Sequence, residues 1–230
     1  MSSQQTEYRT IIPPLVTSRQ FRYIELPNKI RTVLISHPQA KHAACTLSIN
    51  TGAFHDPKPR LGLSHFLEHL IFLGNKRFPE EDYLRKFLKL HSGVTNASTD
   101  ISVTSFYFDV DADYLADSLD IFSASFVDPL FNESSIQREL NAIQSEFNLN
   151  LNQSRKRVIQ CIHYFAKPTH YFNCFLTGNM KTLHPFPHRY SDTRSYMTSL
   201  WKQYYSSEIM TLSILGKGIL LILFIFYEIL

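Results

Sequence analysis

The 230-residue sequence is poor in cysteine: it has only Cys45, Cys161 and Cys174, and these three are far apart. Disulfide-stabilised domains carry an even set of cysteines, so an odd and scattered set is more typical of a reducing compartment. None of the three is part of a Cys-x-x-Cys pair, and we expect them to be ordinary core or surface residues. The pattern predicts a cytoplasmic location.

The sequence also lacks an excess of charge of either sign. Lysine and arginine total 23 and aspartate and glutamate total 20, which gives a formal net charge of +3. No block of basic residues and no basic stripe with interleaved aromatic residues is present, which argues against nucleic-acid binding. Hydrophobic residues make up 44% of the chain. This is enough for a substantial core, so we expect one large globular domain or two small ones.

Long hydrophobic runs are absent from most of the chain. The first residues, MSSQQTEYRTIIPPL, contain no apolar stretch of signal-peptide length and little arginine. A secretory signal is therefore not expected, and a mitochondrial location is less favoured than a cytoplasmic one. The last residues, GILLILFIFYEIL, are almost wholly apolar. They are too few to span a bilayer, which takes about 20 apolar residues, so we expect no membrane association.

Residue periodicity predicts a mixture of strands and helices. Segments rich in β-branched or alternating apolar residues predict strands over 31–36, 44–50, 102–110 and 208–216. Apolar residues at helical spacing predict helices over 61–74, 79–93, 115–126, 134–153 and 197–205. Ser134 and Gln137 form a predicted capping box, and several prolines predict a loop-rich region before residue 197. The order of elements predicts the α+β class, with helices packed on a largely antiparallel β-sheet.

The segment LGLSHFLEHLIFLG, residues 61–74, places His65, Glu68 and His69 inside an otherwise apolar helix. Because His65 and His69 are one helical turn apart, both imidazoles lie on one face, and Glu68 borders that face. Two such histidines can bind one zinc ion, and an adjacent carboxylate can take a proton from water. The order His-x-x-Glu-His is the inverzincin signature. By itself, a match of this length is equally consistent with polar residues on a solvent-exposed face of a helix.

Catalytic zinc usually keeps three protein ligands, so a third ligand must come from elsewhere in the chain. Glu139 and Glu146 are two turns apart on one face of the helix predicted over 134–153, among apolar neighbours. Carboxylates that face a packed region need a cation or hydrogen-bond donors. One of the two can bind the metal directly, and the other can hydrogen-bond a ligating histidine. The spacing alone leaves both assignments open.

Several longer segments follow one another along the chain: GLSHFLEHLIFLGNKRFPEEDYLRKFL, GVTNAST, FYFDV, DPLFNESSIQRELNAIQSEFNLN, FLTGNMKTL and YYSSEIMTLSILGK. In this order they resemble the pitrilysin/insulinase family of zinc metallopeptidases, and within it the insulin-degrading enzyme (insulysin) branch. The resemblance extends from Tyr8 to Lys217. A match of this extent is far more specific than the five-residue motif.

The resemblance implies a zinc-dependent metalloendopeptidase with one Zn2+, held by His65, His69 and Glu146. It implies that Glu68 is the general base that activates water. It also implies that Glu139 supports the metal ligands without binding the metal itself. Asn96 and Ala97 match the edge-strand segment that binds the substrate backbone, in keeping with the addition of an extended peptide to a free sheet edge. Ser98 departs from the family pattern, which has an aromatic residue there, so side-chain preference near the cleaved bond is expected to differ.

Members of this branch contain four homologous domains in two halves, and this chain resembles only the first domain. The second half supplies an arginine and a tyrosine that complete the substrate site. We predict an N-terminal extension over 1–20, a zinc-binding peptidase domain over 21–217 and an aberrant apolar tail over 218–230 of a truncated product. The chain alone is expected to have weak or no activity, and its expected partners are peptides and further homologous domains. The alternative is a non-catalytic zinc-binding or interaction domain of the same fold.

Overall fold

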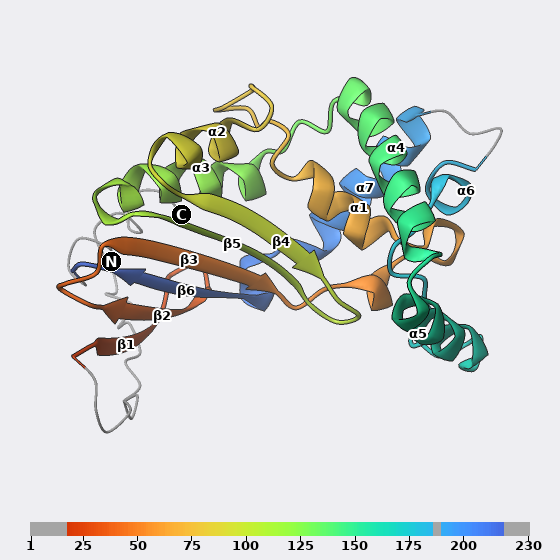
Figure 1. Cartoon of the computed structure of the whole chain (residues 1–230), viewed down its shortest axis with the longest axis horizontal. Coiled ribbons are helices and arrows are strands. Elements are labelled where there is room, and N and C mark those ends of the chain that lie inside the picture. The colour runs from red at the N-terminus through yellow and green to blue at the C-terminus, as the bar shows by residue number, and fades with distance from the viewer. Residues whose placement is uncertain (1–17, 186–189, 219–230) are drawn as a thin grey trace.

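One mixed β-sheet runs through the part of the chain that the computed structural model describes, residues 18–185 and 190–218 (Figure 1). Its strands are β1 Gln20–Glu25, β2 Arg31–Ser36, β3 His42–Ile49, β4 Val94–Thr99, β5 Thr104–Asp111 and β6 Met210–Gly216. They lie in the order β1-β2-β6-β3-β5-β4. Neighbouring strands are antiparallel except β2 and β6, which are parallel.

Helices lie over this sheet and beyond one of its ends. They are α1 Leu63–Leu70, α2 Tyr83–Leu90, α3 Leu115–Val127, α4 Glu133–Asn150, α5 Ser154–Phe165, α6 Met180–Leu183 and α7 Tyr190–Tyr204. α2 and α3 lie over the sheet, whereas α1, α4 and α7 pack together beside the end toward which β3 and β4 point (Figure 1). The predicted α+β class, with helices on a largely antiparallel sheet, is confirmed.

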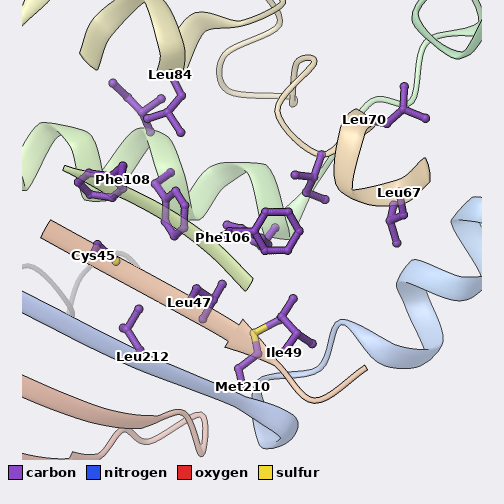
Figure 2. Close-up of a cluster of buried hydrophobic side chains, with 14 of the residues drawn as sticks. Cys45, Leu47, Ile49, Leu67, Leu70, Leu84, Phe106, Phe108, Met210 and Leu212 are labelled. Carbon is purple, nitrogen blue, oxygen red and sulfur yellow. The ribbon is translucent and has the colours of Figure 1, made fainter. Parts of the chain in front are cut away.

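Alternating buried residues of β3, β5 and β6 form the centre of the core. Leu47 and Ile49 are buried on β3, and Phe106 and Phe108 are buried on β5. Leu47 lies opposite Phe106 on one side and Leu212 on the other, and Figure 2 shows all three within one apolar cluster. Full burial of such a side chain contributes about 1.5–3 kcal/mol. The core therefore fixes the part of the sheet against which α1 and β4 are placed.

Several predictions about helix starts are wrong. The helix predicted over 197–205 already begins at Tyr190, as α7. The helix predicted over 79–93 is shorter and begins after Asp82, whose φ of 59° is left-handed and cannot continue a helix. The predicted capping box of Ser134 and Gln137 is not formed. α4 begins at Glu133, so Ser134 already lies inside the first turn, and no side chain caps this helix. Helix ends depend on local hydrogen bonds that the apolar pattern does not record.

α5 lies within a region that was predicted to be loop-rich. Its apolar residues Val158, Ile162 and Phe165 are exposed, with 59%, 54% and 82% of their surface accessible. Residues 1–17 of the predicted extension and residues 219–230 of the predicted apolar tail lie outside the described residues. In the described ranges, no helix has the length and hydrophobicity that a membrane crossing requires.

Candidate metal centre

α1 presents two chemically different faces. Phe66 and Leu67 are fully buried in the core, because apolar residues recur at helical spacing along this side. His65, Glu68 and His69 are only partly buried. The apolar face fixes the rotation of the helix about its axis, and it thereby directs the three polar side chains away from the core. The predicted polar face with His65, Glu68 and His69 is present, but the helix, Leu63–Leu70, is shorter than the predicted 61–74.

α4 brings a glutamate to this polar face. α1 and α4 pack against each other (Figure 1), and Leu140 and Ile143 of α4 are fully buried. Oε2 of Glu146 lies 3.5 Å from Nε2 of His65 and 3.8 Å from Nε2 of His69. One ligand atom of each of these three residues lies within 4.8 Å of the others. Residues that are far apart in the sequence thus form one compact cluster.

The other ring nitrogen of each histidine also has a partner. Nδ1 of His65 lies 3.0 Å from the main-chain oxygen of Thr177, and Nδ1 of His69 lies 3.3 Å from Oε2 of Glu139. A neutral imidazole that donates its Nδ1–H presents the lone pair of Nε2 on its other side. Both Nε2 atoms therefore face Glu146 as potential metal donors. Glu139 contacts His69 only through the nitrogen that does not face Glu146.

This donor set fits a zinc ion. Zinc binds imidazole nitrogen and carboxylate oxygen at about 2.0–2.2 Å, and catalytic sites keep three protein ligands in a tetrahedral arrangement. Tetrahedral bonds of that length put neighbouring donor atoms about 3.3–3.6 Å apart. The two nitrogen–oxygen separations at Glu146, 3.5 Å and 3.8 Å, are close to this spacing. His65, His69 and Glu146 are therefore able to hold one zinc ion and leave a fourth position free.

Carboxylates surround His69 and make its environment negative. Burial lowers the pKa of His69, but the hydrogen bond with Glu139 and the charges of Glu68, Glu139 and Glu146 outweigh burial, so its pKa is raised above the usual value. Arg138 offsets part of this charge, because its Nε lies 3.8 Å from Oε1 of Glu139. The remaining negative charge around the imidazoles favours a bound cation.

Glu68 contacts the edge strand β4. Its Oε2 accepts a hydrogen bond of 2.5 Å from the hydroxyl of Thr99, which is the last residue of β4. α1 packs along this strand. One short helix therefore carries two histidines that face α4 and a carboxylate that reaches the end of β4.

The predicted substrate-binding residues Asn96 and Ala97 lie in the middle of β4. Among the described residues, β4 is the last strand of the sheet and pairs only with β5. Asn96 is exposed and Ala97 is half-buried. Because side chains alternate along a strand, Ala97 and Thr99 share the face that packs on the helices. Asn96 and Ala97 thus lie beside the cluster along the strand, not within it.

Three contributors to the site were not predicted from the sequence: Thr99, Thr177 and Asn150. Nδ2 of Asn150 lies 3.5 Å from Oε1 of Glu146 and 3.4 Å from the hydroxyl of Thr177. Asn150 is one turn beyond Glu146 on α4, so helical spacing could have revealed it. Thr99 and Thr177 carry no such signal, because only tertiary packing brings them to the site.

Comparison with known proteins identifies the family. Residues 31–173 match the family model described as Insulinase (Peptidase family M16). The chain is 39% identical over 207 residues to the A-factor-processing enzyme of Saccharomyces cerevisiae, which covers 90% of this chain and 20% of that protein. It is 38% identical over 200 residues to the insulin-degrading enzyme of Homo sapiens, which covers 86% of this chain and 20% of that protein. The crystal structure of pitrilysin matches with a TM-score of 0.89 and 30% identity, over 95% of this chain and 23% of that one.

These matches cover most of this chain but only a small part of each relative. The family model covers more than half of the chain, whereas the chain spans about a fifth of the length of the two curated relatives. The predicted resemblance to the pitrilysin/insulinase family and its insulin-degrading enzyme branch is confirmed, and it concerns the N-terminal region of that family. With its fold, its sequence and its matched segments in agreement, the chain belongs to the insulinase family of peptidases, M16.

Proposed function

We propose that this chain is the zinc-binding, catalytic domain of a metalloendopeptidase. One observation carries the proposal: Nε2 atoms of His65 and His69 face a single oxygen of Glu146, at 3.5 Å and 3.8 Å, with Glu68 on the same helix. Two nitrogen donors, one oxygen donor and an adjacent base are the groups that a zinc hydrolase requires. Membership of a peptidase family supports the peptide bond as the bond that is cleaved.

Each residue of the cluster has a distinct role in this proposal. His65, His69 and Glu146 would hold the zinc ion, which when bound polarises a carbonyl and lowers the pKa of water. Glu68 is the general base: it takes a proton from the attacking water and passes it to the departing amine. Glu139 accepts the Nδ1–H of His69 and so holds that ring in the tautomer with a free Nε2 lone pair.

We propose that the substrate backbone pairs with β4. The main-chain groups of Asn96 and Ala97 lie on a strand whose other edge is free within the described residues. An extended peptide can add to such an edge by main-chain hydrogen bonds. From Asn96 to Thr99 the strand advances by about 10 Å, at roughly 3.3 Å per residue. A peptide paired here would therefore run toward Glu68, which Thr99 contacts.

Further family domains are the proposed partners of this chain. The relatives are about five times longer than the matched region, and α5 exposes Val158, Ile162 and Phe165. A patch of large exposed apolar side chains is typical of a surface that another polypeptide covers. Because catalysis requires the peptide to be held in reacting geometry, we expect weak or no turnover by the chain alone.

We propose a cytoplasmic location for this chain. Cys45, Cys161 and Cys174 are all free, and Cys161 is exposed. Free thiols persist in a reducing compartment, where disulfides are rare. Imaging of the tagged chain tests this, and an organellar pattern would contradict it.

Metal analysis combined with a peptidase assay tests the proposed function. We expect about one zinc ion per chain, with three ligands from the protein, and loss of thermal stability when a chelator removes the ion. Cleavage of a peptide mixture is expected to be weak for the chain alone. It should rise when the part of the yeast A-factor-processing enzyme that this chain does not match is added. Absence of zinc binding contradicts the site, and zinc binding without cleavage in either mixture favours the non-catalytic alternative.

Thr99 is expected to support Glu68 in this reaction. Thr99→Val keeps the shape of the side chain but removes the hydroxyl that donates to Oε2 of Glu68 at 2.5 Å. A hydrogen bond to a charged group contributes about 1.5–3 kcal/mol, so kcat in the mixed assay should fall about ten- to hundredfold. Thr99→Ser keeps the hydroxyl and should retain most of the activity. Equal kcat values for the two variants would show that the hydroxyl has no role.

A further inference from the structure

Asp56 is a buried carboxylate outside the metal cluster, at the N-terminal end of α1. Its side chain is largely inaccessible, with a residue exposure of 7%. Oδ2 accepts a hydrogen bond of 2.7 Å from the main-chain N–H of Gly62. Oδ1 accepts one of 2.8 Å from the main-chain N–H of Ser64 and one of 2.6 Å from its hydroxyl. Asp56 therefore satisfies several donors at the start of the helix that carries His65.

The hydrogen bonds that Asp56 accepts stabilise the first turn of α1. Hydrogen bonds to an ionised carboxylate are roughly twice as strong as bonds between neutral groups, and a negative charge is favourable at a helix N-terminus. Burial raises the pKa of Asp56 to about 6, although its hydrogen bonds with Ser64, Gly62 and Leu63 lower it. The carboxylate is therefore ionised at neutral pH, and both of its oxygens accept hydrogen bonds from α1.

The loop that carries Asp56 is also attached to the end of β4. The main-chain N–H groups of Ala53 and Phe54 donate to the carbonyl oxygens of Asp100 and Ile101, at 3.1 Å and 2.8 Å. Asp100 and Ile101 are the two residues that follow β4. One short loop thus binds both the start of α1 and the end of the strand that contacts Glu68.

We propose that Asp56 and Ser64 form a positioning pair that fixes α1 relative to β4 and α4. The inference rests on the proposed zinc site, because its effect is on the placement of the ligand His65, which follows Ser64 directly. The buried apolar face of α1 sets the rotation of the helix about its axis. The anchor at its N-terminus sets its position along that axis, and hence how far His65 reaches toward Glu146. Glu68, one turn further along, is positioned in the same way.

Zinc affinity of the folded, metal-free protein tests this pair. Asp56→Asn keeps the shape but replaces one acceptor oxygen by an NH2 group, which faces main-chain donors and cannot bond to them. We expect zinc binding, measured by competition with a chelator at neutral pH, to weaken about ten- to hundredfold, the range for residues that support metal ligands. The spectrum of the cobalt-substituted protein should change in the same variant. Circular dichroism establishes that the metal-free variant is folded, so that a lower affinity reports placement and not unfolding.

Matched variants separate positioning from loss of charge or of a hydroxyl. Asp113→Asn removes a carboxylate whose partner is the exposed Lys217, and Ser123→Ala removes a buried hydroxyl that bonds to a main-chain carbonyl on α3. Both should bind zinc as the wild type does. Ser64→Ala keeps the Asp56 carboxylate and should weaken zinc binding by less than Asp56→Asn. If Asp56→Asn does not fold, the zinc affinity of Ser64→Ala tests the positioning pair instead.

The outcomes are distinguishable from a failure of the proposed function. If the wild type binds no zinc, the metal site and this inference are both overturned. If the wild type binds zinc and the folded Asp56 variant, or Ser64→Ala in its place, binds it equally well with the same cobalt spectrum, only the positioning pair is overturned. Weaker zinc binding in these variants, with unchanged binding in the matched controls, supports the pair.

Discussion

The Glu146→Ala variant is expected to bind no zinc at zinc concentrations that saturate the wild type. Glu146 supplies the only oxygen of the cluster, and that oxygen lies 3.5 Å and 3.8 Å from the two Nε2 atoms. Replacing residues that only support ligands weakens metal binding about ten- to hundredfold, and loss of a ligand should exceed that. His69→Ala should have a comparable effect. Zinc content after dialysis, and affinity by chelator competition, measure both.

The control for this prediction lies on the same helix. Glu133→Ala changes an exposed residue in the first turn of α4, and it should leave about one zinc ion per chain bound, as in the wild type. If Glu146→Ala still binds zinc with wild-type affinity, then the third ligand is a different residue. Retention of zinc by His69→Ala as well would show that the histidine cluster does not hold the metal.

Glu68→Gln is expected to remove peptidase activity while zinc remains bound. The amide cannot accept a proton, and a positioned general base contributes about 10²–10⁴-fold in rate. Glu68 is not one of the three proposed ligands. The zinc affinity of the variant should therefore stay within about threefold of the wild type, which is less than the change seen for residues that support ligands. The two glutamates thus differ in their expected effects: Glu146 controls binding, and Glu68 controls turnover.

The assay uses the chain alone and the chain mixed with the unmatched part of the yeast A-factor-processing enzyme. Glu80→Gln is the control, because Glu80 is exposed and its ion-pair partner is Lys86. It should match the wild type in both kcat and zinc content. Turnover by Glu68→Gln at the wild-type rate would exclude Glu68 as the base. Loss of zinc from the same variant would instead make Glu68 a ligand, whether or not turnover is detected.

Helical spacing predicted which side chains of α1 share a face, and the structure agrees. The four-residue interval between His65 and His69 placed both imidazoles on one face, and Phe66 and Leu67 are fully buried on another. The same reasoning identified the helix that carries Glu146. It failed at the helix ends, as at Ser134, because a cap depends on a few hydrogen bonds and not on the apolar pattern.

Spacing alone does not predict which of Glu139 and Glu146 lies near the Nε2 atoms of the histidines, because both glutamates lie on the same face of α4. The tertiary structure separates them: Oε2 of Glu146 lies near both Nε2 atoms, whereas Oε2 of Glu139 lies 3.3 Å from Nδ1 of His69. The distinction arises from how α1 crosses α4. That crossing is set by buried side chains from both helices, which sequence spacing does not describe.

The sequence by itself determined the residue types, their helical faces and the family resemblance of this protein. These follow from periodicity within single elements and from long matching segments, both of which are properties of the linear chain. Only the tertiary structure decided that Thr99 contacts Glu68, that the carbonyl of Thr177 contacts His65 and that Asp56 anchors α1. The reason is physical. Each of these contacts joins different segments through a hydrogen bond, and such a bond forms only after the core has brought the segments together.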